Sequence, residues 1–209
     1  SIFFGGGTPS VMSSEFFHEF LNFVRQHIEI NAHTEITLEA NPGTTETSKF
    51  VGYRQAGINR LSLGVQSFQS HQLEKLGRIH SGGDALRAVE QAKQAGFDNF
   101  NLDLMHGLPD QTIETALADL QQALDLNPPH LSWYQLTIEQ NTEFFRHPPA
   151  LPEDEALWEI QLAGADLLKQ HNRQQYEVSA FALPGKEAQH NLNYWRFGDY
   201  LGIGCGSHG

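Results

Sequence analysis

Three consecutive glycines near the start of the sequence could hold a ligand through their backbone. Gly5–Gly7 follow the apolar run Ser1–Phe4 and precede Thr8. A run of β-branched and aromatic residues that ends in glycine is typical of the carboxyl end of a buried strand. Because glycine has no side chain, the backbone there can approach a ligand closely. A plain turn from a strand to a helix is the alternative interpretation, since the segment contains no catalytic side chain.

Four other polar residues have side chains that suit a charged, hydroxylated ligand. Glu39 is an anionic acceptor, and Arg78 can offer a bidentate fork to a carboxylate. The amide of Gln66 both donates and accepts hydrogen bonds. Asp103 lies among apolar neighbours, where an unpaired carboxylate is costly, so we expect it to accept from a hydroxyl. Glu39 and Arg78 could instead be solvated charges at the ends of a strand and a helix.

Strand-like and helix-like stretches alternate along the first 140 residues. The expected strands are Ser1–Phe4, Glu35–Ala40, Arg60–Val65, Asn99–Met105 and Leu131–Ile138. The expected helices are Ser14–Ile28, Thr45–Gln55, His71–Leu76, Gly83–Gln94 and Ile113–Leu126. This alternation favours right-handed βαβ units and a parallel sheet. Short strands that are apolar throughout are expected to be buried on both faces, as in a barrel.

The polar candidates fall at or near the carboxyl ends of the expected strands, where barrels gather their functional groups. They are Gly5–Thr8, Glu39, Gln66, Asp103 and the segment from Gln135 to Glu139. The sequence therefore predicts an α/β fold, a partial (β/α)6 barrel of parallel strands with flanking helices, over residues 1–140. Residues 141–209 are expected to add a proline-rich connection, a long helix at Asp154–His171, a strand at Tyr176–Phe181 and a final segment at Gln189–Trp195.

That final segment is a second candidate site. It reads His190-Asn191-Leu192-Asn193-Tyr194-Trp195. The imidazole of His190 could ligate a metal ion, and Tyr194 and Trp195 could pack against a flat ligand. A histidine at the start of a helix followed by two core aromatics would have the same sequence pattern.

Taken together, these segments resemble a known family. The glycine run is similar to the motif that holds the methionine end of S-adenosylmethionine (SAM) in radical SAM proteins. The other matching segments, in chain order, are Glu39–Gly43, Gly64–Phe68, Leu76–His80, Asn101–Pro109 and His190–Trp195. Over essentially the whole chain they resemble the oxygen-independent coproporphyrinogen III oxidase family, and within it the HemW subfamily of radical SAM haem chaperones.

The resemblance implies which residues hold SAM and haem. For SAM they are Gly6, Gly7, Thr8, Glu39, Gln66, Arg78, Asp103 and Met105. Glu39 would bind the amino group and Arg78 the carboxylate, while Gln66 and Asp103 would bind hydroxyls. Met105 would flank the adenine, although it could equally fill the core. For haem the resemblance implies His190 as a possible axial iron ligand, together with Tyr194 and Trp195.

The resemblance also implies a [4Fe–4S] cluster, for which this sequence lacks the ligands. The cluster motif of the family, C-x3-C-x2-C, lies upstream of the glycine motif, and Cys205 is the single cysteine here. One thiolate cannot hold a cluster that needs three or four. We therefore expect the sequence to be a fragment cut at both ends that lacks the first barrel unit. The longer protein that includes the upstream cysteines is called the extended protein below.

Composition limits the partners and the compartment. A net charge of −12 at pH 7, from 13 Lys and Arg against 25 Asp and Glu, argues against nucleic acid as the main partner. A single cysteine excludes an internal disulfide and suits a reducing cytoplasm. No apolar stretch approaches the roughly 20 residues that a membrane span needs. We expect a cytoplasmic protein without a membrane span.

Three functions follow from these observations. The resemblance implies a radical SAM protein that binds haem and delivers it to acceptor proteins, with an electron donor for its cluster. The alternative within the family is the oxidase, which converts propionates of coproporphyrinogen III to vinyl groups. A remote alternative is a phosphate-binding barrel enzyme or aldolase. It would need a Schiff-base lysine or metal ligands at strand ends, and no lysine lies on an expected strand.

Overall fold

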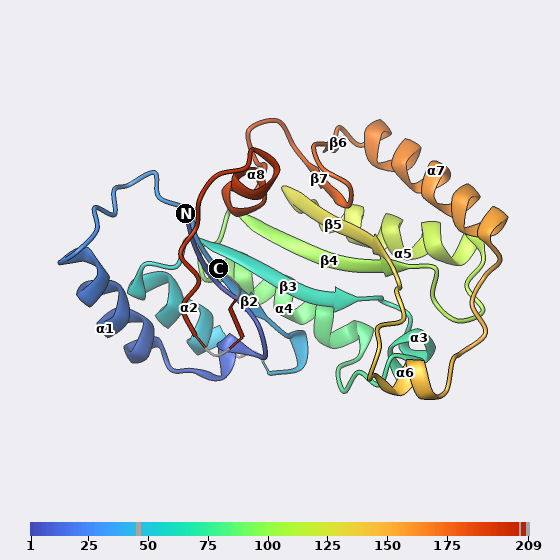
Figure 1. Cartoon of the computed structure of the whole chain (residues 1–209), viewed down its shortest axis with the longest axis horizontal. Helices are drawn as coiled ribbons and strands as arrows, with labels where there is room; N and C mark the ends of the chain where they lie inside the picture. Colours follow the sequence, from blue (N-terminus) through green and yellow to red (C-terminus); the bar gives the residue numbers. More distant parts are fainter. Residues whose placement is uncertain (45–46, 205, 208–209) are drawn as a thin grey trace.

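The computed structural model describes residues 1–44, 47–204, 206 and 207, and its centre is one seven-stranded sheet (Figure 1). The strand order is β1-β2-β3-β4-β5-β7-β6. The strands are β1 Ile2–Phe4, β2 Ile36–Ala40, β3 Arg60–Gln66, β4 Phe100–His106, β5 His130–Gln135, β6 Gln174–Gln175 and β7 Ala180–Ala182. β1 to β5 pair in parallel in chain order, whereas β7 is antiparallel to both β5 and β6. The expected parallel α/β fold is confirmed.

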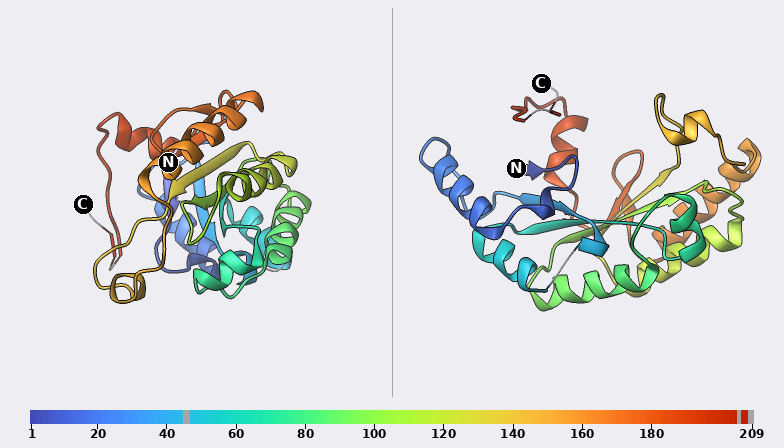
Figure 2. Two further views of the ribbon diagram at one scale, coloured as in Figure 1. Left: turned by 90° about the vertical axis from the view of Figure 1, so that its right-hand side faces the viewer. Right: turned by 90° about the horizontal axis from the view of Figure 1, so that it is seen from below.

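Helices flank this curved sheet, most of them on its outer face (Figure 2). They are α1 Ser14–Arg25, α2 Thr47–Ala56, α3 Ser70–Lys75, α4 Gly82–Gln94, α5 Ile113–Asp125, α6 Glu143–Arg146, α7 Asp154–Gln170 and α8 Gln189–Trp195. Figure 2 shows α1, α2, α4 and α5 along one side of the sheet, with α8 and the carboxyl-terminal tail on the other. The inner face is therefore left free of covering helices over much of its area, as in an open barrel.

The strands alternate between an apolar outer face and a polar inner face. On β3, Leu61, Leu63 and Val65 belong to the buried core beneath the helices, whereas Ser62 and Gln66 line an inner cavity. Successive side chains of a strand point to opposite faces, so this pattern has a period of two. The expected burial on both faces holds for most residues of β2, β3 and β4, but the strands are not apolar throughout, because their inner face carries polar side chains.

The segment after residue 140 differs from its expectation in one element. The expected strand Tyr176–Phe181 is wrong, since this stretch is mostly the loop between β6 and β7, in which the Ser179 N–H donates to Glu177 Oε2 at 3.2 Å. β5 also ends at Gln135, three residues before its expected end at Ile138. The long helix is confirmed as α7, and the final segment forms the helix α8. The division into domains at residues 140 and 141 stays a prediction.

Close packing of α7 on the sheet gives a test of the fold. A Cβ added at Gly164 would overlap the buried indole of Trp133. Gly164→Ala is therefore expected to lower the free energy of unfolding by about 1–3 kcal/mol, as overpacking does. Gly83→Ala is the matched control, since its Cβ would meet nothing nearer than 3.5 Å in helix α4. Urea unfolding that shows equal stability for both variants would contradict this packing.

Candidate functional site

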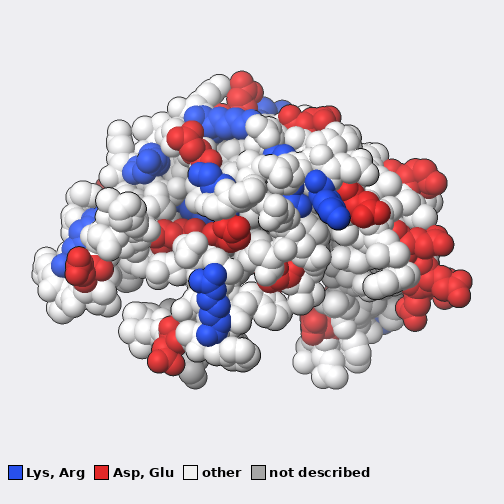
Figure 3. All heavy atoms as spheres, turned by 90° about the horizontal axis from the view of Figure 1, so that it is seen from above, with Lys and Arg blue, Asp and Glu red and all other residues white. Residues whose placement is uncertain are grey.

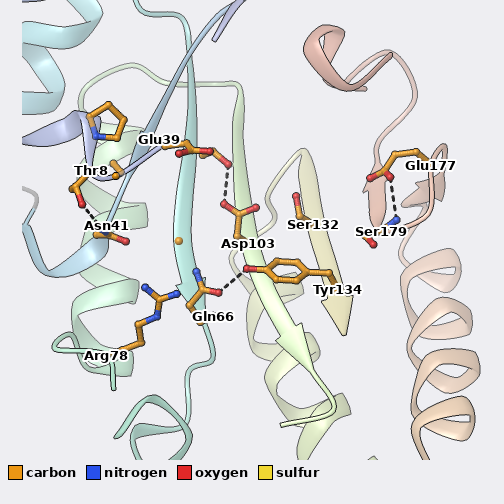
Figure 4. Close-up of a pocket in the computed structure, with 15 residues that line it drawn as sticks. Thr8, Glu39, Asn41, Gln66, Arg78, Asp103, Ser132, Tyr134, Glu177 and Ser179 are labelled. Carbon is orange, nitrogen blue, oxygen red and sulfur yellow. Dashed lines mark hydrogen bonds between the residues drawn. The ribbon is translucent and has the colours of Figure 1, made fainter. Parts of the chain in front are cut away.

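A cavity of about 640 Å³ opens on the inner face where β1 to β5 run toward their carboxyl ends (Figure 4). Ligand pockets typically measure about 300–1,000 Å³, so it could take a cofactor-sized molecule. Its lining is strongly polar. The residues are Gly7, Thr8, Pro9, Glu39, Ala40, Asn41, Ser62, Gly64, Gln66, Arg78, Asp103, Ser132, Tyr134, Glu177 and Ser179. Six residues expected to hold SAM are thus brought together: Gly7, Thr8, Glu39, Gln66, Arg78 and Asp103.

Residues Gly5–Gly7, called the glycine strap below, run across one wall of this cavity. Gly6 and Gly7 have φ of 77° and 56°, in the left-handed region that favours glycine. A Cβ at Gly5 would lie 2.5 Å from the ring of Phe3 and 3.2 Å from Glu39 Cδ, so only glycine fits there. The Gly6 N–H donates to Glu39 Oε2 at 3.0 Å. Glu39 therefore anchors the strap while its carboxylate also faces the cavity.

Three acidic residues line this cavity, and the pKa of two of them, Glu39 and Asp103, is shifted. Burial raises the pKa of the Glu39 carboxyl, and the nearby Asp103 raises it further. Burial likewise raises the pKa of Asp103, against the hydrogen bonds that it accepts. The Ser62 hydroxyl donates to its Oδ2 at 2.9 Å, and the Asn101 amide donates to its Oδ1 at 2.7 Å. These bonds fix the plane of the carboxylate, so the site offers positioned acceptors to a cation and to hydroxyls.

Gln66 is held in a strained conformation. Its φ is 66°, which is uncommon for a residue other than glycine and typical of functional sites. The Tyr134 hydroxyl donates to Gln66 Oε1 at 2.7 Å, which leaves the amide N–H groups available to a ligand. Behind it, Asp119 accepts from the Ser67 hydroxyl and, at 2.8 Å, from the Phe68 N–H. The loop that follows β3 is therefore fixed from the helix side.

Arg78 supplies a cation at the rim of the cavity (Figure 4). It is exposed, and within the part of the chain that the structure describes it makes no ion pair. The loop that carries it is anchored just after Arg78 by His80 and Ser81. The His80 ring bonds to the Val65 carbonyl at 3.0 Å, and Ser81 forms a capping box with Asp84 at the start of α4. The guanidinium is thus well placed for a ligand carboxylate.

Met105 lies apart from the residues that line the cavity. It follows Asp103 by two positions on β4 and so shares its face, where it is half-buried. Sequence reasoning missed Asn41, Ser132 and Tyr134. On β5, Ser132 and Tyr134 alternate with the buried Leu131 and Trp133, and this period-two pattern could have identified them.

A second cavity, of about 770 Å³, lies between the glycine strap, α8 and the tail after it. Its lining is Phe3, Gly5, Gly6, Gly7, His190, Tyr194, Tyr200, Leu201, Gly202, Ile203, Gly204, Gly206 and Ser207. The half-buried His190 ring stacks on Phe3, with ring centroids 4.2 Å apart, and meets Tyr194 edge-on at 4.9 Å. Trp195 is not among the lining residues and is exposed. Because Gly7 lines both cavities, the strap separates them.

The described residues offer no place for an iron–sulfur cluster. Among them, no group of three or more His, Cys, Asp or Glu could hold a metal ion. Cys205 lies outside the described residues, and a single thiolate would not suffice. Nor does any helix in the described ranges combine the length and apolar character needed to cross a membrane. Figure 3 shows one face of the molecule, where Lys and Arg side chains are dispersed among acidic ones.

The family follows from comparison with known proteins. The model of the radical SAM superfamily matches residues 1–123, which is more than half of the chain. The chain belongs to the radical SAM superfamily. Radical SAM proteins use SAM together with a [4Fe–4S] cluster, in agreement with the resemblance seen in the glycine motif.

Curated relatives of the chain include haem chaperones. The chain is 59% identical to the haem chaperone HemW of Escherichia coli over 209 residues, which is 100% of this chain and 55% of that protein. It is 37% identical to the haem chaperone HemW of Bacillus subtilis, again over 100% of this chain and 56% of the relative. The chain therefore spans about half the length of these relatives.

Two solved structures support the fold. Coproporphyrinogen III oxidase (HemN) from Escherichia coli matches with a TM-score of 0.79 and 26% identity, over 93% of this chain and 45% of that one. Elp3 from the archaeon Methanocaldococcus infernus matches with a TM-score of 0.67 and 19% identity, over 79% of this chain and 44% of that one. The latter likeness shows the fold alone.

Proposed function

We propose that the extended protein is a cytoplasmic haem chaperone of the HemW type, which binds SAM and haem and passes haem to acceptor proteins. The observation that carries the proposal is the pair of adjoining cavities. Six of the residues predicted to bind SAM line one cavity, and His190 and Tyr194 line the other. The identity of 59% with a named haem chaperone over the whole chain supports it.

The first cavity fits SAM group by group. The ammonium of SAM suits the anionic Glu39, and the carboxylate of SAM suits the guanidinium of Arg78. The methionine end would run along the backbone of the glycine strap, where no side chain intervenes. Ribose hydroxyls would meet the acceptor Asp103 and the amide of Gln66. A phosphate ligand fits poorly, because three carboxyl groups line the same cavity.

Arg78 provides one test of this assignment. Arg78→Ala in the extended protein should weaken SAM binding by about tenfold, because a charge-assisted hydrogen bond contributes about 1.5–3 kcal/mol and this one is exposed. Arg87→Ala is the control, since Arg87 is an exposed arginine paired with Asp84. Equilibrium dialysis with labelled SAM measures both. Equal affinities for the two variants would remove Arg78 from the site.

The acidic pair predicts a pH dependence. Because the pKa of the free Glu39 and Asp103 carboxyls is raised, both take up protons at a higher pH than ordinary carboxyl groups. SAM requires them ionised, so its affinity should fall as the pH falls through these raised pKa values and stay constant above them. A dialysis series between pH 8 and about pH 4 tests this. An affinity that rises as the pH falls would contradict the assignment.

The second cavity fits haem as cargo. Burial lowers the pKa of His190, which favours the neutral imidazole that iron requires. Phe3, Tyr194 and Tyr200 supply aromatic surface, and Leu201 and Ile203 supply aliphatic surface. Haem-acceptor proteins would receive the haem from this side of the strap.

The cluster has no ligands among the residues of this sequence beyond Cys205. Reductive cleavage of SAM therefore depends on residues outside this chain and on an electron donor to the cluster. The part played by this chain is to bind SAM and hold its reactive end in place.

The oxidase is a second candidate, because the structure of a coproporphyrinogen III oxidase matches over 93% of the chain. One experiment separates the two. The reconstituted extended protein is incubated anaerobically with SAM, a reductant and coproporphyrinogen III, and separately, once loaded with haem, with an apo-haemoprotein. The chaperone proposal expects haem transfer without vinyl product. Stoichiometric formation of the divinyl product without haem transfer would favour the oxidase.

A further inference from the structure

A partly buried chain of hydrogen bonds crosses the inside of the barrel from α8 to the first cavity. The Ala188 N–H, immediately before α8, donates to the Tyr176 hydroxyl at 3.2 Å. Tyr176 Oη lies 2.6 Å from His130 Nε2, and His130 Nδ1 lies 2.7 Å from Asn101 Oδ1. The Asn101 amide nitrogen then donates to Asp103 Oδ1 at 2.7 Å. Every link joins residues that are distant in sequence or lie on different strands, apart from the last.

The direction of each bond follows from the donors present. Asn101 uses its amide N–H groups on Asp103 and Ser62, so its Oδ1 must accept from His130 Nδ1–H. Burial holds the pKa of His130 well below its usual value, so the ring is neutral and its Nε2 is an acceptor. Burial raises the pKa of Tyr176 to about 12, so its hydroxyl keeps the proton that it donates to His130. Each group in the chain therefore has one consistent role.

The start of α8 is also held by a buried ion pair. Glu35 Oε1 accepts from the Gln189 N–H at 2.9 Å and lies 3.4 Å from the His190 N–H. Its other oxygen lies 3.9 Å from Arg60 Nε, and both side chains are nearly inaccessible. α8 has no capping side chain of its own, so these contacts replace a local cap. Figure 1 shows α8 near the amino ends of β4 and β5, away from their arrowheads.

We propose that Tyr176, His130 and Asn101 are positioning residues that connect Asp103 in the first cavity with the helix that carries His190. The proposal rests on the proposed function, in which Asp103 contacts SAM and α8 contacts haem. A ligand hydroxyl on Asp103 fixes the carboxylate that the Asn101 amide already holds. The chain, to which Ser62 and Ser132 also bond at Asn101, then transmits this restraint to the backbone at residues 188–190.

Hydrogen exchange of α8 tests this in the extended protein with its cluster reconstituted. Exchange at residues 188–190 is followed by mass spectrometry with and without saturating SAM. In the wild type, SAM is expected to slow this exchange. Tyr176→Phe removes the acceptor of the Ala188 N–H, so baseline exchange should rise about tenfold and the response to SAM should vanish. SAM affinity in this variant should stay within about threefold of wild type, because the Asp103 contacts to Ser62 and Asn101 remain.

A pair of substitutions at His130 distinguishes positioning from simple loss of packing. His130→Gln keeps one donor and one acceptor and should retain the SAM response, whereas His130→Phe keeps the bulk and should lose it. Tyr53→Phe is the control for removing a tyrosine hydroxyl elsewhere, because that hydroxyl contacts Ser10 and Met12. It should leave baseline exchange in α8 unchanged.

The outcomes separate this proposal from the proposed function. A Tyr176→Phe or His130→Phe protein that keeps the wild-type SAM response in α8 would overturn the positioning role. Failure of the wild type to bind SAM in dialysis would instead overturn the proposed function. In that case the baseline hydrogen exchange of Tyr176→Phe still tests the bond between the Ala188 N–H and the Tyr176 hydroxyl. An exchange rate at residues 188–190 equal to that of the wild type would refute this bond.

Discussion

Glu39→Gln in the extended protein is expected to weaken SAM binding by about 10- to 100-fold. The substitution removes the negative charge that faces the SAM ammonium, and a hydrogen bond between charged groups contributes about 1.5–3 kcal/mol. The amide oxygen of glutamine can still accept from the Gly6 N–H, whose bond to Glu39 anchors the strap. The loss of SAM affinity should therefore result from the missing charge and not from a displaced glycine strap.

Glu90→Gln is the control for Glu39→Gln, because Glu90 is exposed on α4 and lies outside both cavities. Isothermal titration with SAM measures both variants under anaerobic conditions. An affinity of Glu39→Gln within about twofold of the control would exclude Glu39 as the ammonium partner, since that difference is near 0.4 kcal/mol.

His190→Ala in the extended protein is expected to abolish or shift the Soret band of bound haem. His190 carries the only ligating nitrogen that lines the second cavity within the described residues. If His190 ligates the haem iron, its removal changes the axial ligation and hence the spectrum. Loss of a residue that only lines the cavity would change the affinity for haem alone. Absorption spectra of haem-loaded wild type and variant measure the effect.

His27→Ala serves as the control for His190→Ala, because His27 lies just after α1 and contacts Phe23, away from the second cavity. Circular dichroism verifies that both variants are folded, since the Phe3 stack on His190 is lost in one of them. A folded His190→Ala protein whose haem spectrum matches that of wild type would reject axial ligation by this residue.

The sequence predicted the parallel sheet and most of the first cavity. Each strand from β1 to β5 has a polar group within its carboxyl-terminal part or just after it, and parallel strands bring such groups to one end of a barrel. Gly7, Glu39, Gln66 and Asp103 line one cavity for this reason. Their roles toward SAM came from the family resemblance and stay predictions.

Other features depend on contacts that local patterns do not encode. The bonds from Glu35 to residues 189 and 190 join segments 154 and 155 positions apart. The strand expected at Tyr176–Phe181 fails because β6 and β7 hold only two and three residues, too few for a clear alternation. Trp195 follows Tyr194 directly on α8, so the two side chains point in different directions and only Tyr194 lines the cavity.

The central claim is that SAM and haem occupy separate cavities on the two sides of the glycine strap. Its most direct test titrates both ligands into Glu39→Gln and His190→Ala of the extended protein. Glu39→Gln should lose SAM affinity and keep the wild-type Soret band, and His190→Ala should lose or shift that band and keep SAM affinity. Loss of both ligands in either folded variant would contradict two separate sites.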